Sequence, residues 1–220
     1  MTRIKICCIA GVEEANLAVN YGASALGLVS NMPSGPGVIS EDLIEEIALS
    51  VPPAIATFLL TSKQSVDEII TQHKKCKTNT IQICDHLKNG THMQLKDALP
   101  GIKIVQVIHV VDENSIKEAI EISRSVDAIL LDSGNQKLKI KELGGTGRTH
   151  DWSISRKIKN SISIPLFLAG GLNDDNVDEA ISLVKPFGVD VCSGVRTNNK
   201  LDEQKLKSFV EKVKTADRSN

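Results

Sequence analysis

Short apolar runs alternate with longer amphipathic stretches along the whole chain. In the third amphipathic stretch, Val66, Ile69 and Ile70 have the i, i+3, i+4 spacing of one helix face. The short runs predict strands at residues 3–9, 24–30, 53–60, 79–84, 102–110, 127–132, 164–169 and 187–192. The amphipathic stretches predict helices at residues 12–21, 41–50, 64–75, 91–98, 114–124, 153–160, 174–184 and 202–214.

Eight strands that are each followed by a helix predict a parallel sheet, because parallel neighbours need a crossover connection. An eightfold repeat of this unit closes into a (β/α)₈ TIM barrel, and 220 residues suit the compact end of that fold. A doubly wound open sheet is the alternative, although no G-x-G-x-x-G follows the first strand. Without a linker or a shift in composition, residues 1–220 are expected to form one domain, with 215–220 as a frayed tail.

The composition favours a globular protein without nucleic-acid or membrane partners. Apolar residues make up 41% and charged residues 24%, which is typical of folded domains. The 26 basic and 27 acidic residues give a net charge of −1, so no basic surface for polyanions is expected. No apolar run approaches the ~20 residues of a membrane helix. The first residues turn polar too early for a signal peptide, so we expect a cytoplasmic protein.

The cysteines are expected to remain thiols, because their number is odd and the expected compartment is reducing. They are Cys7, Cys8, Cys76, Cys84 and Cys192. A zinc site could be imagined from His73, Cys76, Cys84 and His86, but their spacing matches no closed zinc signature. We therefore expect no metal.

Cys7 stands at the end of the first predicted strand, where active sites of TIM barrels lie. Ile4, Ile6 and Cys8 alternate there with Lys5 and Cys7. The apolar set is expected to face the helices, which leaves Cys7 on the lumen face and makes Cys8 a packing residue. A thiol at the position of Cys7 is a base or nucleophile if its pKa is lowered, and otherwise an inert buried side chain.

Asp132 ends the sixth predicted strand and can play a second chemical role at the same rim. Its carboxyl group could protonate a leaving oxygen, or it could form an Asx turn or cap a helix. Cys7 and Asp132 together would supply one soft base and one carboxylic acid. This is the pair that proton transfer on a carbon framework requires.

Glycine-rich segments follow the seventh and eighth predicted strands. They are LAGGLND, which contains Gly170 and Gly171, and CSGVRTN, which contains Ser193 and Gly194. Backbone N–H groups in such turns, with a helix N-terminus behind them, form a common phosphate cradle in these barrels. A small-molecule sugar phosphate is the ligand that this pattern predicts.

Two further features lie at the same predicted rim. The longest connection, residues 133–151, contains most of GGTGRTHDW and is typical of a glycine-hinged lid. His109, near the end of the fifth predicted strand, could bind metal or substrate, or it could satisfy a local hydrogen bond.

Six segments resemble the phosphoribosylanthranilate isomerase family, and they occur in the family's order: KIC, ALGLV, LLD, GGTGRTHDW, LAGGLNDDNV and VDVCSGV. The resemblance spans residues 3 to about 213. It implies a (β/α)₈ barrel that catalyses an Amadori rearrangement in tryptophan biosynthesis without metal or organic cofactor. It implies Cys7 as general base and Asp132 as general acid, and it places the substrate phosphate at Gly170–Gly171 and Ser193–Gly194.

The chain departs from the family pattern at several positions. Cys8 replaces the glycine that usually follows the catalytic cysteine. The family's motif Q-L-H-G corresponds to QICD at residues 82–85 of this chain. The family's S-x-R arginine, which faces the substrate carboxylate, is missing from MPSGPGVIS at residues 32–40. A replacement cation could come from Arg148 or Arg196.

These departures keep alternatives to the isomerase open. One alternative is a related isomerase of another phosphorylated amino-sugar, and another is a non-catalytic barrel that binds phosphosugars or a partner. The presence of both Cys7 and Asp132 counts against the non-catalytic barrel. A metal-dependent epimerase is weaker still, because the strand ends supply no convincing metal ligands. A monomer or a homodimer is expected in each case.

Overall fold

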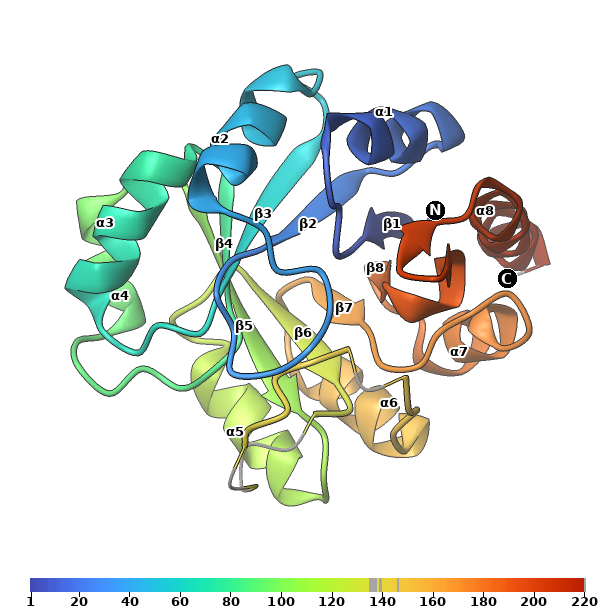
Figure 1. The fold of residues 1–220 in the computed structure, drawn as a ribbon. Coiled ribbons are helices and arrows are strands. Elements are labelled where there is room, and N and C mark those ends of the chain that lie inside the picture. Colours follow the sequence, from blue (N-terminus) through green and yellow to red (C-terminus); the bar gives the residue numbers. More distant parts are fainter. Residues whose placement is uncertain (135–137, 139, 146, 220) are drawn as a thin grey trace.

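The structure is a computed structural model that describes residues 1–134, 138, 140–145 and 147–219. Its parallel strands form a closed barrel in chain order (Figure 1). They are β1 (Arg3–Ile6), β2 (Ala25–Val29), β3 (Ala56–Thr61), β4 (Thr80–Ile83), β5 (Lys103–His109), β6 (Ala128–Asp132), β7 (Leu166–Leu168) and β8 (Gly188–Val191). β1 pairs with both β2 and β8, which closes the sheet and confirms the (β/α)₈ prediction over the open sheet.

One helix follows each strand of the barrel and packs on its outer surface (Figure 1). The helices are α1 (Val12–Tyr21), α2 (Glu41–Ser50), α3 (Val66–Cys76), α4 (His92–Ala98), α5 (Asn114–Ile122), α6 (Trp152–Ser161), α7 (Val177–Val184) and α8 (Glu203–Ser219). No helix in the described ranges is long and apolar enough to cross a membrane. The strands are mostly shorter than predicted, because several apolar residues at their ends already belong to the loops that form the rim.

The connection between β8 and α8 contains elements that the sequence pattern did not predict. A short 3₁₀ helix, η1 (Ser193–Val195), is followed by the antiparallel strands β9 (Arg196–Thr197) and β10 (Lys200–Leu201). Asn198 and Asn199 turn between these strands with φ of 52° and 61°, a conformation that asparagine tolerates.

The last helix, α8, extends past its predicted end at residue 214. Asp217 on this helix accepts hydrogen bonds from the backbone N–H and the hydroxyl of Thr2, both at 2.7 Å. The helix end is therefore joined to the start of the chain. The fraying expected at 215–220 stays a prediction, and Asn220 lies outside the described residues.

Two layers of apolar side chains hold the barrel together. The outer layer lies between strands and helices and includes Ile6, Leu26 and Leu131. The inner layer fills the lumen and includes Val105 and Phe167. Burial of each such large side chain contributes about 1.5–3 kcal/mol, so the strand ends that carry the rim residues are held on a rigid scaffold.

Candidate active site

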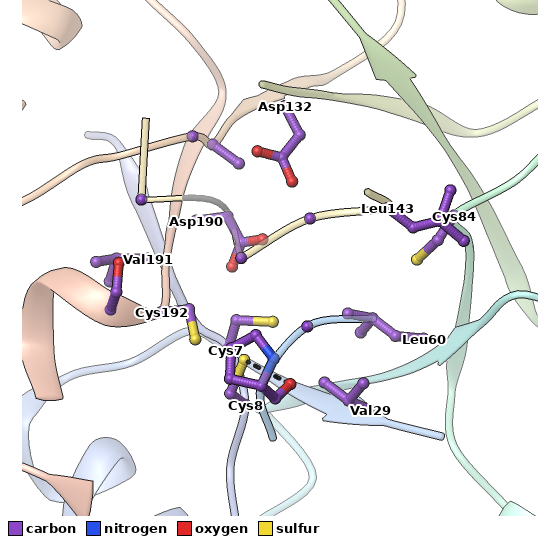
Figure 2. A pocket seen from close by; sticks show the side chains of 18 of the residues that line it. Cys7, Cys8, Val29, Leu60, Cys84, Asp132, Leu143, Asp190, Val191 and Cys192 are labelled. Atoms are coloured by element: carbon purple, nitrogen blue, oxygen red, sulfur yellow. Dashed lines mark hydrogen bonds between the residues drawn. The ribbon is translucent and has the colours of Figure 1, made fainter. Parts of the chain in front are cut away.

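The carboxyl ends of the strands surround a cavity of about 70 Å³. Figure 2 shows Cys7 and Asp132 on facing sides of this cavity, with Asp190 between them. Most of the predicted site residues line it, namely Cys7, Asp132, Gly170, Gly171 and Ser193. Gly194 is not among the lining residues and contributes through its backbone packing instead.

Cys7 follows the last residue of β1 and is buried in the lumen, as the sequence pattern predicts. Its N–H donates to the carbonyl of Val191 at 2.8 Å, so the end of β1 remains joined to β8. The pKa of Cys7 lies below the ordinary thiol value, chiefly because the Cys8 side chain hydrogen bonds to it. Burial opposes this shift, and the charge of Lys5 supports it. The thiolate form that a general base requires is therefore favoured.

Lys5 lies beneath Cys7 and is fully buried. Its Nζ donates to Asp190 Oδ2 at 2.8 Å, and the two residues are register partners on β1 and β8. Burial alone would lower the pKa of Lys5, but the Asp190 carboxylate raises it above its ordinary value, so the ammonium persists. A Cβ at Gly27 would lie 2.8 Å from Cys7 Sγ and 3.0 Å from Lys5 Nζ, which makes these groups neighbours across the glycine.

Asp132 ends β6 and is buried at the opposite side of the cavity. Burial raises its pKa above the ordinary value for aspartate, while the charge of His109 and the N–H of Ser133 at 2.7 Å oppose the rise. The protonated acid therefore persists to higher pH than in an exposed aspartate. Cys7 and Asp132 are shifted in opposite directions, which suits one base and one acid acting at the same pH.

The prediction that Cys8 packs with Ile4 and Ile6 against the helices is wrong. β1 ends at Ile6, and Cys8 adopts a left-handed φ of 63°. The period-two alternation of a strand therefore stops before Cys8, and its side chain joins the lumen cluster with Cys7.

The two glycine-rich loops meet at the cavity beside β7 and β8. Gly170 and Gly171 have φ of 86° and 63°, which glycine adopts without strain. A Cβ at Gly194 would lie 2.1 Å from the Leu172 carbonyl oxygen, so glycine allows η1 to approach the β7 loop closely. The N–H groups of Gly170, Gly171 and Gly194 donate to no acceptor in the described part of the chain. These N–H groups fit an anion-binding cradle.

Two loops cross the open end of the barrel, one between β2 and α2 and one between β6 and α6 (Figure 1). The second is the predicted lid, of which residues 135–137, 139 and 146 lie outside the described part. Leu143, Gly144 and Gly145 from it line the cavity. Lys141 of this loop forms an ion pair with Asp85 after β4, and its carbonyl accepts a hydrogen bond from Ser34 at 2.7 Å.

Comparison with protein-family models identifies the N-(5'-phosphoribosyl)anthranilate isomerase family over residues 4–212. The chain belongs to this family. An isomerase from Methanosarcina mazei, N-(5'-phosphoribosyl)anthranilate isomerase 2, is 36% identical over 96% of this chain and 94% of its own.

Solved structures agree with this assignment. A phosphoribosylanthranilate isomerase bound to reduced 1-(o-carboxyphenylamino)-1-deoxyribulose 5-phosphate has a TM-score of 0.79 and 28% identity, over 98% of this chain and 100% of the other. Monomers generated from the dimeric Thermotoga maritima enzyme also have a TM-score of 0.79, with 27% identity and the same coverage. The protein is thus an isomerase of the tryptophan biosynthetic family.

The two arginines that could replace the family's carboxylate-facing arginine are both engaged elsewhere. Arg196 pairs with Glu14 and donates to the carbonyls of Cys8 and Asn199. Arg148 pairs with Glu142 on the lid. Of the described residues that line the cavity, none is basic.

The structure also places the remaining residues that the sequence pattern singled out. His109 makes a local hydrogen bond, in which Nε2–H donates to the Cys84 carbonyl oxygen at 3.1 Å. Within the described ranges, no group of three or more His, Cys, Asp and Glu side chains could hold a metal ion, so His73, Cys76, Cys84 and His86 form no zinc site. The absence of a cofactor stays a prediction.

Sequence reasoning did not identify Lys5 and Asp190 as functional residues. A signal was present, because Lys5 stands two residues before Cys7 and therefore shares its strand face. The partner could not be found in this way, since Asp190 is 185 residues away and meets Lys5 only through barrel closure.

Proposed function

We propose that this isomerase converts N-(5'-phosphoribosyl)anthranilate to 1-(2-carboxyphenylamino)-1-deoxyribulose 5-phosphate, with Cys7 as general base and Asp132 as general acid. The observation that carries the proposal is their placement on facing sides of one cavity, with their pKa values shifted in opposite directions. The phosphate would bind between the β7 loop and η1, at Gly170–Gly171 and Ser193–Gly194.

The reaction needs one proton transfer to the furanose ring oxygen and one from C2 of the sugar. Asp132 donates its proton to the furanose ring oxygen as the bond from C1 to that oxygen breaks, and the ring opens to a protonated Schiff base. The Cys7 thiolate then removes the proton from C2, and the electron pair of this C–H bond neutralises the iminium nitrogen. The resulting enolamine tautomerises to the ketose product. Each proton transfer contributes typically ~10²–10⁴-fold to the rate.

The test is turnover of this substrate by Cys7→Ser and Asp132→Asn. Each variant should lower kcat by about 10²–10⁴-fold, while binding of the reduced product analogue changes little, because the phosphate loops remain intact. Cys76→Ser is the matched control, since Cys76 lies at the end of α3 outside the cavity. Turnover by Cys7→Ser close to that of the unaltered protein would show that Cys7 is not the base.

The phosphate site needs a separate test. Gly171→Val is unsuitable, because a Cβ there would lie 2.6 Å from the backbone of Arg148 and would displace the lid as well. Ser193→Asp instead places a negative charge at the cradle and should raise KM strongly. Asn199→Asp, outside the cavity, is the charge-matched control. Equal KM values for the two variants would exclude this cradle.

A second candidate, favoured by the lack of a basic residue among the described lining residues, is isomerisation of a phosphorylated amino-sugar without the aryl carboxylate. Assays with both substrates, together with complementation of a tryptophan auxotroph, separate the two functions. Growth of the auxotroph supports the anthranilate substrate, and turnover of only the carboxylate-free substrate overturns it.

Assembly and location also remain proposals. We infer a monomer or a homodimer in the cytoplasm, in line with the dimeric Thermotoga maritima relative and with the monomers generated from it. Sedimentation and cell fractionation test these proposals.

A further inference from the structure

The connection between β8 and α8 lies beside the start of α1 (Figure 1), and a buried ion pair joins the two segments. The Arg196 side chain in this connection is only 7% exposed. Its Nη1 donates to Glu14 Oε1 at 3.2 Å and its Nη2 to Glu14 Oε2 at 2.8 Å, which is a bidentate pair. Nη1 also donates to the carbonyl of Asn199 at 2.8 Å. The guanidinium is therefore fixed from two sides.

The same guanidinium holds the turn that follows β1. Arg196 Nη2 donates to the Cys8 carbonyl oxygen, and Glu14 Oε2 accepts from the N–H of Ala10 at 3.0 Å. The ion pair thus binds one acceptor and one donor of the backbone, on either side of Ile9. A hydrogen bond from a charged group is stronger than one between neutral groups, so this contact can maintain a backbone conformation that is otherwise unfavourable.

Cys8 has such an unfavourable conformation. Its φ of 63° is left-handed, and in this region the Cβ of an L-residue lies too close to the following carbonyl oxygen. The β2 loop also crowds Cys8, because a Cβ at Gly37 would lie 2.4 Å from the Cβ of Cys8. Glycine would adopt the same φ without strain. With cysteine at this position, the turn depends on the contacts that hold it.

The turn at Cys8 determines where the thiol of Cys7 lies. Cys7 N–H donates to the carbonyl of Val191 at 2.8 Å, and Ile9 N–H donates to the carbonyl of Gly27 at 3.1 Å. Both neighbours of Cys8 are therefore anchored to adjacent strands. If Cys8 left the left-handed region, the torsions of Cys7 would have to absorb the change, and its Sγ atom would move.

We propose that Arg196 is a positioning residue for Cys7. Arg196 does not line the cavity, so it acts through the backbone and not on the substrate. Its bond to the Cys8 carbonyl maintains the left-handed turn, and the turn keeps the Cys7 thiol at the rim of the cavity. The effect on catalysis rests on the proposed function of Cys7 as general base, whereas the effect on the turn does not.

Arg196→Lys tests this role in the full chain. Lysine keeps the charge that Glu14 needs, but it lacks the planar fork that bonds Glu14, Cys8 and Asn199 together. We expect kcat to fall by about tenfold with little change in KM, since a displacement of ~1 Å at a reacting group can cost ~10²-fold. Protection of the Ile9 N–H against hydrogen exchange, measured by NMR, should also fall.

Lys205→Met is the control for a general loosening of this connection. Lys205 Nζ donates to the carbonyl of Arg196 at 3.0 Å, so the variant loses a contact with the same residue but keeps the guanidinium in place. Both kcat and the protection of Ile9 should stay unchanged in this variant.

Cys8→Ala and Cys8→Gly show whether Arg196 acts through the turn. Both remove the thiol, but only glycine adopts the left-handed φ without strain. Arg196→Lys should therefore lower kcat by about tenfold when combined with Cys8→Ala, and by less than about twofold when combined with Cys8→Gly. Because neither combination contains the Cys8 thiol, a direct effect of this thiol on Cys7 cancels.

The proposal is overturned if Arg196→Lys lowers kcat equally in the two combinations, or if it raises KM and leaves kcat unchanged. Unfolding of Arg196→Lys that only Cys8→Gly prevents would support it, and unfolding in both combinations would overturn it. Loss of Ile9 protection without loss of turnover would contradict the proposed role of Cys7 alone. Unchanged protection in an active enzyme would contradict only the role of Arg196.

Discussion

The Nζ atom of Lys5 donates to Asp190 Oδ2 at 2.8 Å directly beneath Cys7. Both side chains lie inside the barrel, where an isolated charge is costly, and each offsets the desolvation of the other. The ammonium also lies next to the thiol across Gly27 and favours its ionised form. Asp190 Oδ1 has no hydrogen-bond partner among the described residues, so only Oδ2 of this carboxylate holds the ammonium of Lys5.

Lys5→Met tests the electrostatic effect of this pair on Cys7. Loss of the ammonium should raise the pKa of Cys7 and move the acidic limb of the kcat/KM profile to higher pH. The variant should also lose about 3–5 kcal/mol of unfolding free energy, because the Asp190 carboxylate remains buried without its partner. The measurements are the pH dependence of kcat/KM and urea unfolding.

The double variant Lys5→Met/Asp190→Leu separates these two effects. Removal of both charges should restore much of the stability, since two apolar side chains replace a buried ion pair. The acidic limb should move part of the way back, because the Asp190 carboxylate raises the pKa of Cys7 and its removal opposes the loss of Lys5. A limb that stays where Lys5→Met puts it would show that the Asp190 carboxylate does not act on Cys7.

Gly27→Ala should impair catalysis by crowding the base. The new Cβ would lie 2.8 Å from Cys7 Sγ and 3.1 Å from Cys7 Cα, so the thiol must move. A displacement of about 1 Å at a reacting group can reduce the rate ~10²-fold. Gly11→Ala is the control, because a Cβ there contacts nothing within 4 Å. Similar kcat values for both variants would contradict the tight placement of Cys7.

The sequence predicted those features of the site that depend on local periodicity. Alternation along β1 placed Cys7 in the lumen, and the strand ends identified Asp132 and the glycine loops. Cys8 was misplaced because β1 ends earlier than its apolar run, and the left-handed turn that follows gives no signal in a cysteine. Arg196 was not located, because its partner Glu14 comes from α1 at the other end of the chain. Contacts made by closure of the barrel are not encoded in any local pattern.

Asp132→Asn should stabilise the fold increasingly as pH rises. Burial raises the pKa of Asp132 in the folded state, so the protonated carboxyl group adds to the free energy of unfolding. This contribution is complete below the pKa that Asp132 has in the unfolded chain, and it is lost as pH rises through its pKa in the folded protein. Asparagine cannot ionise and escapes this loss. The difference in unfolding free energy should therefore grow from about pH 4 upward, by about 1.4 kcal/mol for each unit of pKa shift.

Asp151→Asn provides a control of opposite sign. Asp151 caps α6, and its hydrogen bonds with Ser153 lower its pKa. Its stabilisation is present above the unfolded pKa and is lost as pH falls. This variant should become less stable relative to the unaltered protein as pH rises, and urea unfolding between pH 4 and 7 measures both differences. If the two variants changed in the same direction, the assigned shift at Asp132 would be wrong.

Lys141→Met should weaken closure of the lid. The ion pair between Lys141 and Asp85 joins the β6 loop to the end of β4, and the Asp85 side chain is only 5% exposed. A hydrogen bond to a charged group contributes about 1.5–3 kcal/mol, so we expect KM to rise by about tenfold or more. Trypsin should cleave the variant faster after Arg148, and the reduced product analogue should protect it less against this cleavage.

Lys157→Met is the control. It removes an ion pair with Glu113 in which both side chains are largely exposed, and it should leave KM unchanged. An equal KM for Lys141→Met and Lys157→Met would show that the lid is held without this ion pair.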